Sequence, residues 1–197
     1  PQPLCPHFDK ETRRNRQTQP AHRNDRSVPR CYLAHRSLAD RRKYAQWADA
    51  YQENQVTIAY DTMWNGTESI AHKIASEIHA QSPDTVVKVF NIAKSDKNEV
   101  MTEVFKSKAI AVGSPTVGCS ILSSVAGWLE FLKQLKFKNK RAAAFGCYGW
   151  SGESVKILQA KLKEAGFDVI DDNIRSQWNP EESDYAAVPE LVKHLLG

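Results

Sequence analysis

Long apolar runs are missing from this sequence. No segment reaches about 18 consecutive apolar residues, the length at which a membrane helix becomes a candidate. The first residues show neither a charged-then-apolar leader nor a small-residue cleavage site, the two features of a secretory signal. The sequence therefore predicts a cytoplasmic protein that does not cross a membrane.

Cysteine is scarce as well. The four cysteines lie far apart and form no C-x-x-C pair: Cys5, Cys31, Cys119 and Cys147. Zinc ribbons, rubredoxin-type iron centres and disulfide frameworks all depend on paired or closely spaced cysteines. We therefore expect four free thiols and no metal site built from them.

Acidic residues are few at the beginning of the chain. Residues 1–43 contain eleven Lys or Arg and only four Asp or Glu, so with a net charge of +4 overall the remaining residues carry −3. The same segment has few large aliphatic side chains and cannot bury enough apolar area to offset the entropy of ordering it, so we expect residues 1–42 to be disordered. Because residues 13–42 lack interleaved aromatic residues and any recognised fold, no nucleic-acid partner is predicted.

The rest of the chain alternates short apolar runs with amphipathic stretches. A linker helix is expected at 43–55, where an apolar stripe recurs at helical spacing. Strands are then expected at 56–60, 86–90, 109–113, 142–145 and 167–170, and helices at 67–80, 95–105, 121–134, 153–165 and near the C-terminus up to Leu196. Gly166 is expected to end the fourth of these helices, and Pro189 to lie in the first turn of the last or to kink it.

This alternation predicts an α/β fold, a doubly wound five-stranded parallel sheet with helices on both faces. In such sheets ligands bind beyond the carboxyl ends of the strands, where the strand order reverses. The loops after strands 1, 3 and 4 are therefore the candidates for a binding site.

The loop after the first strand suits a phosphate group. It runs from Asp61 to Thr67 and opens a helix, whose N-terminus offers unpaired N–H groups and a partial positive charge. Thr62, Asn65 and Thr67 add polar side chains, and Gly66 is expected to adopt the positive φ that curls the backbone round an anion. The alternative interpretation is a polar turn capped by Thr67.

The other two loops suit a flat ring. Residues 113–120 are rich in turn formers, and residues 146–152 combine three glycines with Tyr148 and Trp150. Glycine lets the backbone approach a ring closely, and aromatic faces can stack on it. Trp150 alone could equally be a partly buried surface residue, but three suitable loops at one sheet edge favour a binding site.

Three motifs carry a resemblance to a known family. Y-D-T-M-W-N-G-T (60–67), V-G-S-P-T (112–116) and A-F-G-C-Y-G-W-S-G (144–152) resemble the flavodoxin-domain signatures of the flavodiiron proteins, which are oxygen or nitric oxide reductases. The resemblance covers residues 43–197 and implies a flavodoxin-like domain with strand order 2-1-3-4-5 and FMN as its cofactor.

The resemblance also implies which residues bind FMN. The phosphate would be held by Thr62, Met63, Trp64, Asn65, Gly66 and Thr67. The ring would be bordered by Pro115, Thr116, Val117, Gly118, Gly146, Cys147, Tyr148, Gly149, Trp150, Ser151 and Gly152. Many family members carry asparagine where this chain has Gly118-Cys119, so backbone groups are expected to replace that side chain.

The diiron centre of the family has no counterpart in the sequence. The family binds iron in a preceding metallo-β-lactamase-like domain through H-x-E-x-D-H and further ligands, a motif this chain lacks. Its six histidines are dispersed, and His72 and His79 are expected to be surface residues. Residues 1–42 are interpreted as an out-of-frame remnant of that domain, because some codon choices for 32–34 and 40–42 hide Ile-Trp-Arg and Ile-Val-Glu.

The resemblance therefore predicts an FMN-binding electron-transfer module of a flavodiiron-type oxygen or nitric oxide reductase that lacks the diiron domain. The module is expected to have no catalytic or metal-ligating residues of its own. Its predicted partners are rubredoxin, a flavin or NAD(P)H reductase, and a separate diiron domain. The alternative is an NAD(P)H-dependent quinone or FMN reductase of flavodoxin-like type. A receiver-type phosphoacceptor is disfavoured, because the third strand ends without Asp and the fourth without Lys.

Overall fold

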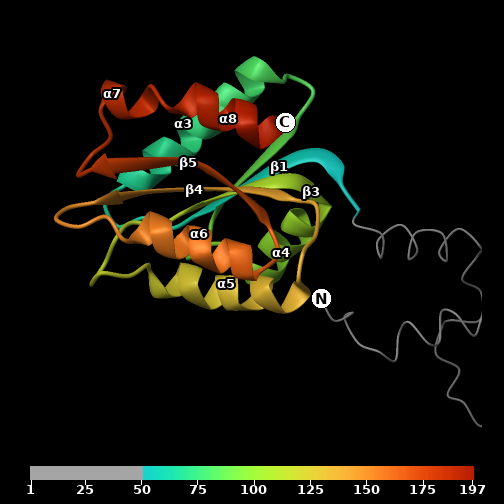
Figure 1. Cartoon of the computed structure of the whole chain (residues 1–197), viewed down its shortest axis with the longest axis horizontal. Coiled ribbons are helices and arrows are strands. Elements are labelled where there is room, and N and C mark those ends of the chain that lie inside the picture. The colour runs from blue at the N-terminus through green and yellow to red at the C-terminus, as the bar shows by residue number, and fades with distance from the viewer. Residues whose placement is uncertain (1–50) are drawn as a thin grey trace, which may run out of the picture. The chain divides into compact units, whose positions relative to one another are not determined.

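The computed structural model describes residues 51–197, which form a five-stranded sheet with helices on both sides (Figure 1). The predicted remnant at 1–42 and most of the predicted linker helix at 43–55 lie outside the described residues. The strands are β1 (Glu53–Tyr60), β2 (Val86–Asn91), β3 (Ser107–Gly113), β4 (Arg141–Tyr148) and β5 (Asp168–Gln177). The helices are α3 (Gly66–Gln81), α4 (Lys97–Lys106), α5 (Ser123–Leu135), α6 (Ser154–Glu164), α7 (Glu182–Tyr185) and α8 (Val188–Leu196).

The strand order is β2-β1-β3-β4-β5, and every neighbouring pair is parallel. In β1, which lies between β2 and β3, Ala59 is opposite Phe90 of β2 and Val112 of β3. Residues 55–60 of this strand are all buried, as expected for a strand covered on both faces. The α/β fold and the strand order implied by the resemblance are confirmed, and the order reverses between β1 and β3.

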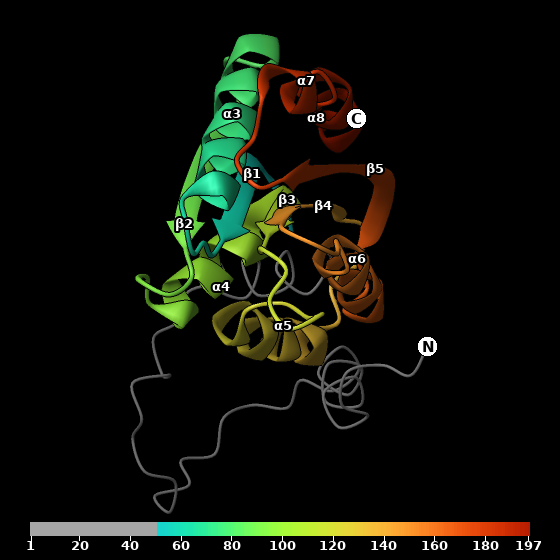
Figure 2. The same ribbon diagram turned by 90° about the vertical axis from the view of Figure 1, so that its left-hand side faces the viewer.

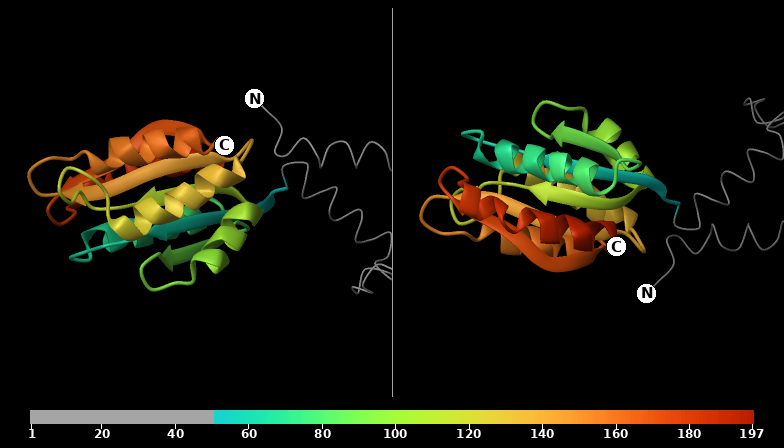
Figure 3. Two further views of the ribbon diagram at one scale, coloured as in Figure 1. Left: turned by 90° about the horizontal axis from the view of Figure 1, so that it is seen from below. Right: turned by 90° about the horizontal axis from the view of Figure 1, so that it is seen from above.

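Each face of the sheet has its own apolar core. Helices α3 and α8 cover one face, and α4, α5 and α6 cover the other (Figures 2 and 3). Ile70, Ile74 and Ile78 of α3 pack on the first face, as their helical spacing predicts. Trp128 of α5 is fully buried on the second face.

Most element boundaries agree with the sequence expectation to within a few residues, and three details differ. The expected linker helix overlaps β1, which already begins at Glu53. The last strand runs to Gln177 rather than to Ile170, and the C-terminal helix is divided into α7 and α8. Gly166 has a φ of 93° directly after α6, and Pro189 lies in the first turn of α8, as predicted.

None of the helices within residues 51–197 combines the length and the apolar character that spanning a bilayer requires.

Candidate cofactor-binding site

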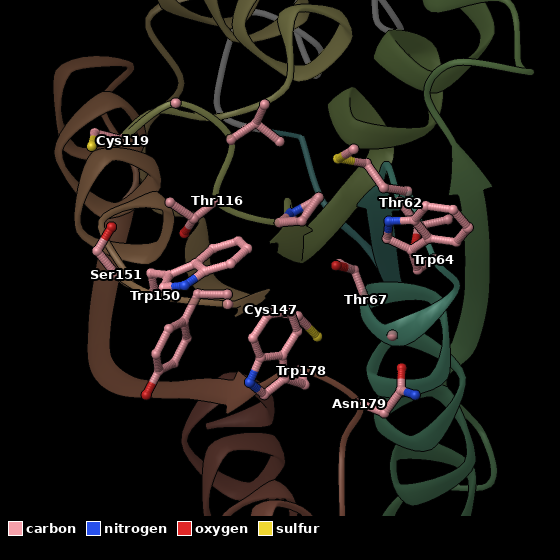
Figure 4. A pocket seen from close by; sticks show the side chains of 17 residues that line it. Thr62, Trp64, Thr67, Thr116, Cys119, Cys147, Trp150, Ser151, Trp178 and Asn179 are labelled. Carbon is pink, nitrogen blue, oxygen red and sulfur yellow. The ribbon is translucent and has the colours of Figure 1, made fainter.

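A cavity of about 890 Å³ opens at the sheet edge where β1, β3 and β4 end (Figure 4). Fourteen of the seventeen predicted site residues line it: Thr62, Met63, Trp64, Gly66, Thr67, Pro115, Thr116, Val117, Gly118, Cys147, Tyr148, Gly149, Trp150 and Ser151. Three further lining residues escaped the sequence analysis: Cys119, Trp178 and Asn179. The three loops chosen from the sequence thus meet in one cavity.

The first loop turns sharply into α3. Asn65, rather than Gly66, has the left-handed backbone (φ 63°), so the expectation of a positive φ at Gly66 is wrong. Asparagine tolerates this conformation because its side chain is short and polar. The Ser69 N–H donates to the Asn65 carbonyl at 2.9 Å, so the N–H groups of Gly66, Thr67 and Glu68 form the free first turn of the helix.

Gly66 is required for another reason. A Cβ at this position would stand 3.1 Å from Cys147 Sγ and 3.3 Å from the Trp178 carbonyl oxygen. The start of α3 therefore packs closely against the loop after β4 (residues 146–152, called the fourth loop because it follows the fourth strand) and against the loop after β5. A side chain at Gly66 would push these segments apart.

Two hydroxyl groups beside this helix N-terminus have no partner within residues 51–197. The Oγ1 atoms of Thr62 and Thr67 are buried and make no hydrogen bond there. A buried polar atom without a partner is costly, and native proteins usually satisfy it. Because no Lys, Arg or His within residues 51–197 lines the cavity, neutral donors are available there for an anion: hydroxyls, backbone N–H groups and the Asn179 amide. This arrangement fits a phosphate.

Asp61 holds the first loop in place. One of its carboxylate oxygens accepts the Thr62 N–H at 2.8 Å, and the other accepts the Ser124 hydroxyl of α5. The Asp61 side chain is largely buried and does not line the cavity. It therefore fixes the loop without contributing charge to the cavity wall.

The loop after β3 is a tight turn. The N–H groups of Val117 and Ser120 donate to each other's carbonyls at 3.0 and 2.9 Å, and the two residues between them, Gly118 and Cys119, both have positive φ. Two consecutive positive φ values are typical of a type I′ turn. Thr116 anchors its base, because its N–H donates to the Cys147 carbonyl at 2.8 Å.

Aromatic side chains flank the cavity. Trp64 and Trp150 are 84% and 89% exposed and stand on opposite sides of it (Figure 4). The Arg175 guanidinium lies over the Tyr148 ring, 5.4 Å from the centre of the ring. Exposed indole faces on two sides of an apolar cavity fit a flat aromatic ring.

Cys147 lies on the buried floor between these parts. Burial raises the pKa of its thiol to about 11, so the group is neutral at physiological pH. The floor of the cavity therefore adds no negative charge.

Three predicted site residues do not line the cavity. Asn65 shapes the first loop from outside. Gly146 lets β4 approach the loop after β3, since a Cβ there would stand 2.1 Å from the Ser114 carbonyl oxygen. Gly152 makes room for Arg175, whose Nη2 would be 2.9 Å from a Cβ. Gly146 and Gly152 are required for packing within the protein. The sequence alone does not distinguish this requirement from close approach to a ligand.

A doubly wound sheet that carries, at its switch point, an aromatic-flanked cavity and a free helix N-terminus defines a flavin-nucleotide-binding domain. The sequence model of the flavodoxin family matches residues 58–189. The chain therefore belongs to the flavodoxin family, and the assignment of FMN as its cofactor is confirmed.

Similar proteins define the kind of flavodoxin-like domain more narrowly. The chain is 47% identical over 153 residues to the anaerobic nitric oxide reductase flavorubredoxin of Aeromonas hydrophila, covering 78% of this chain and 31% of that protein. Among solved structures, the rubredoxin oxygen:oxidoreductase of Desulfovibrio gigas superposes with a TM-score of 0.74 at 34% identity, covering 79% of this chain and 38% of that one. The flavodiiron protein of Giardia intestinalis gives a TM-score of 0.66 at 27% identity, covering 79% and 39%.

The chain thus matches the flavodoxin-like domain of flavorubredoxins and flavodiiron proteins and spans about a third of their length. This supports the FMN-binding module predicted from the sequence and does not favour the quinone reductase alternative. Within residues 51–197, no three His, Cys, Asp or Glu side chains are grouped so that they could hold a metal ion.

Proposed function

We propose that this chain carries electrons through one FMN for a flavodiiron-type oxygen or nitric oxide reductase. The observation that carries the proposal is a pair of hydroxyls, those of Thr62 and Thr67, beside the free N-terminus of α3 at the sheet's switch point. Neither hydroxyl has a partner within residues 51–197. FMN supplies one- and two-electron chemistry, while the protein supplies binding and orientation.

The residues have separate roles in this proposal. Thr62, Thr67 and the first N–H groups of α3 receive the phosphate. Trp64 and Trp150 cover the two sides of the ring, and the turn at 117–120 borders its edge. The neutral Cys147 thiol keeps the floor apolar, which excludes water from the buried side of the cofactor.

The donor and acceptor of the electrons are proposed from the relatives. One is named a flavorubredoxin and another a rubredoxin oxygen:oxidoreductase. We therefore propose that a rubredoxin, or a flavin or NAD(P)H reductase, delivers electrons to this domain. Since residues 51–197 offer no metal-binding group, reduction of oxygen or nitric oxide would take place at a diiron domain elsewhere.

Calorimetric titration of the purified protein with FMN tests the proposal. We expect about one FMN per chain and much weaker binding of riboflavin, which lacks the phosphate. The loaded protein should accept electrons from dithionite but should not turn over NAD(P)H with a quinone. Equal affinity for FMN and riboflavin would contradict the phosphate site, and rapid quinone turnover would favour the reductase alternative.

A further inference from the structure

The loop after β5 touches both ends of the cavity. Trp178 directly follows β5 and has a left-handed backbone with a φ of 60°. Its N–H donates to the Tyr148 carbonyl at 2.7 Å. Its own carbonyl oxygen lies 3.3 Å from the place where a Cβ on Gly66 would stand. A single residue thus connects the phosphate end of the cavity to the ring end.

The Trp178 indole packs against the fourth loop. It meets the Trp150 ring edge-on, with 5.0 Å between the centroids and 71° between the planes. A Cβ on Gly149 would stand 3.1 Å from the Trp178 ring, so glycine is what allows this contact. Figure 4 shows both indoles projecting into the same cavity from neighbouring loops.

Other residues at the end of β5 also support the fourth loop. The Gln177 side-chain amide donates to the Gly149 carbonyl at 3.1 Å, and the Arg175 guanidinium covers the Tyr148 ring. Because the Trp150 ring is 89% exposed, few groups fix its orientation. Within residues 51–197, Trp178 is the aromatic residue that packs against it.

We propose that Trp178 is a positioning residue for the cofactor: it holds Trp150 in the orientation that receives the flavin ring before FMN binds. The inference rests on the proposed function of the cavity. A wall that is ordered in advance removes the cost of immobilising a side chain on binding. The usual strength of an aromatic pair corresponds to about a two- to tenfold gain in affinity.

A double-mutant cycle on the full chain tests this role. The dissociation constant of FMN is measured by calorimetry for Trp150→Ala, Trp178→Ala and the double variant. Alanine, like tryptophan, has a Cβ and is equally strained in the left-handed conformation at position 178. Trp178→Ala therefore removes the ring without changing the backbone strain. We expect Trp178→Ala to weaken binding about two- to tenfold in the parent, as the aromatic pair requires, and to have no further effect when Trp150 is already absent.

Trp64→Ala is the matched control, because Trp64 lines the opposite side of the cavity. Its effect should add to that of Trp178→Ala. If the losses of FMN affinity in Trp150→Ala and Trp178→Ala add in the double variant, Trp178 contacts FMN independently of Trp150. If Trp178→Ala binds FMN as tightly as the parent, Trp178 has no role in cofactor binding. Either result overturns the proposal.

A second measurement needs no cofactor. Two indoles 5.0 Å apart give an exciton-coupled band in the circular dichroism spectrum, which we expect to disappear in Trp150→Ala and in Trp178→Ala but to remain in Trp64→Ala. The absence of this band from the parent protein would overturn the proposal. A parent that shows the band but takes up no FMN would instead overturn the function proposed for the cavity.

Discussion

The two threonine hydroxyls that lack a partner in the described part of the chain give the sharpest expectation for a single residue. Thr67→Val removes a donor to the phosphate and should weaken FMN binding by about 1.5–3 kcal/mol, roughly 10- to 150-fold, as for a hydrogen bond to a charged group. Riboflavin binding should be unchanged, and the free protein should be as stable as the parent or more so, because a buried unsatisfied hydroxyl is lost. Thr67→Ser is the control that keeps the hydroxyl. An equal loss of affinity for FMN and riboflavin would contradict a role at the phosphate.

Gly66 is expected to matter through space rather than through backbone conformation. Gly66→Val should weaken FMN binding more than Thr67→Ser, because its side chain would displace Cys147 and the backbone of Trp178. Gly66→Ala should have a smaller effect of the same kind. Calorimetry measures the FMN affinity of both variants, and thermal unfolding measures the stability of the free proteins. Full affinity in Gly66→Val would show that the contact between these loops is not needed.

The two cysteines of the cavity should react very differently. The thiolate is the reactive form, and burial raises the pKa of Cys147 to about 11 while Cys119 is exposed. At pH 8 iodoacetamide should label Cys119 first, and labelling of Cys147 should accelerate as the pH approaches 11. Peptide mass spectrometry separates these sites from Cys5 and Cys31, and FMN should protect Cys119. Equal rates at Cys119 and Cys147 would contradict the burial of the Cys147 thiol.

At the scale of elements, a buried lysine joins three segments at the sheet edge opposite the cavity. Lys140 is 2% exposed, and its ammonium donates to the carbonyls of Tyr51 and Phe105 at 3.0 and 2.9 Å and to that of Ser107. The Tyr51 carbonyl lies just before β1, the Phe105 carbonyl in the last turn of α4, and the Ser107 carbonyl at the start of β3. Burial nevertheless outweighs these bonds and lowers the pKa of Lys140 to about 8.

This pKa predicts a pH dependence of stability. Between pH 8 and the ordinary pKa of 10.5 the unfolded chain keeps the proton that the folded protein has released, so the free energy of unfolding should rise with pH in this window. Urea unfolding at several pH values should therefore show the free energy of unfolding of the parent rising, relative to that of Lys140→Met, between pH 8 and 10.5. Titration of Cys147 lowers stability above pH 9, but it does so in both proteins and cancels in the difference. The same slope in both would contradict the prediction.

The sequence predicts the elements well where burial is continuous and less well where it is not. The apolar runs of β1, β3 and β4 are buried on both faces and were recognisable from composition. The second half of β5 was not recognisable in this way, because only Ile174 and Ser176 are buried in that edge strand. Its length therefore depends on pairing with β4, which no local pattern records.

The same reason explains why Trp178 and Asn179 escaped prediction. Their loop follows the strand whose end was misplaced, and their contacts with the first and fourth loops are distant in the sequence. The signal was nonetheless present: in an all-parallel sheet, every residue that directly follows a strand lies at the same edge. A Trp-Asn-Pro turn after the last strand was thus a candidate for the cavity wall.

At the scale of the whole molecule, the electron-carrier function proposed above predicts how the isolated protein responds to iron. It should take up about one FMN and accept electrons, yet iron supplied during expression should give no reduction of oxygen to water or of nitric oxide to nitrous oxide. Iron analysis and gas-electrode assays measure this directly. Iron-dependent reductase activity from this chain alone would contradict the electron-carrier function.

The placement of the tryptophans gives the molecule an optical reporter of its own state. Three of its five tryptophans, Trp64, Trp150 and Trp178, line the cavity and are exposed, whereas Trp128 is buried in the core on one face of the sheet. Exposed indoles emit at longer wavelength than buried ones, and a flavin absorbs where indoles emit. Binding of FMN should therefore quench the red-shifted emission most strongly, so that loading and loss of the cofactor can be followed in real time without any label.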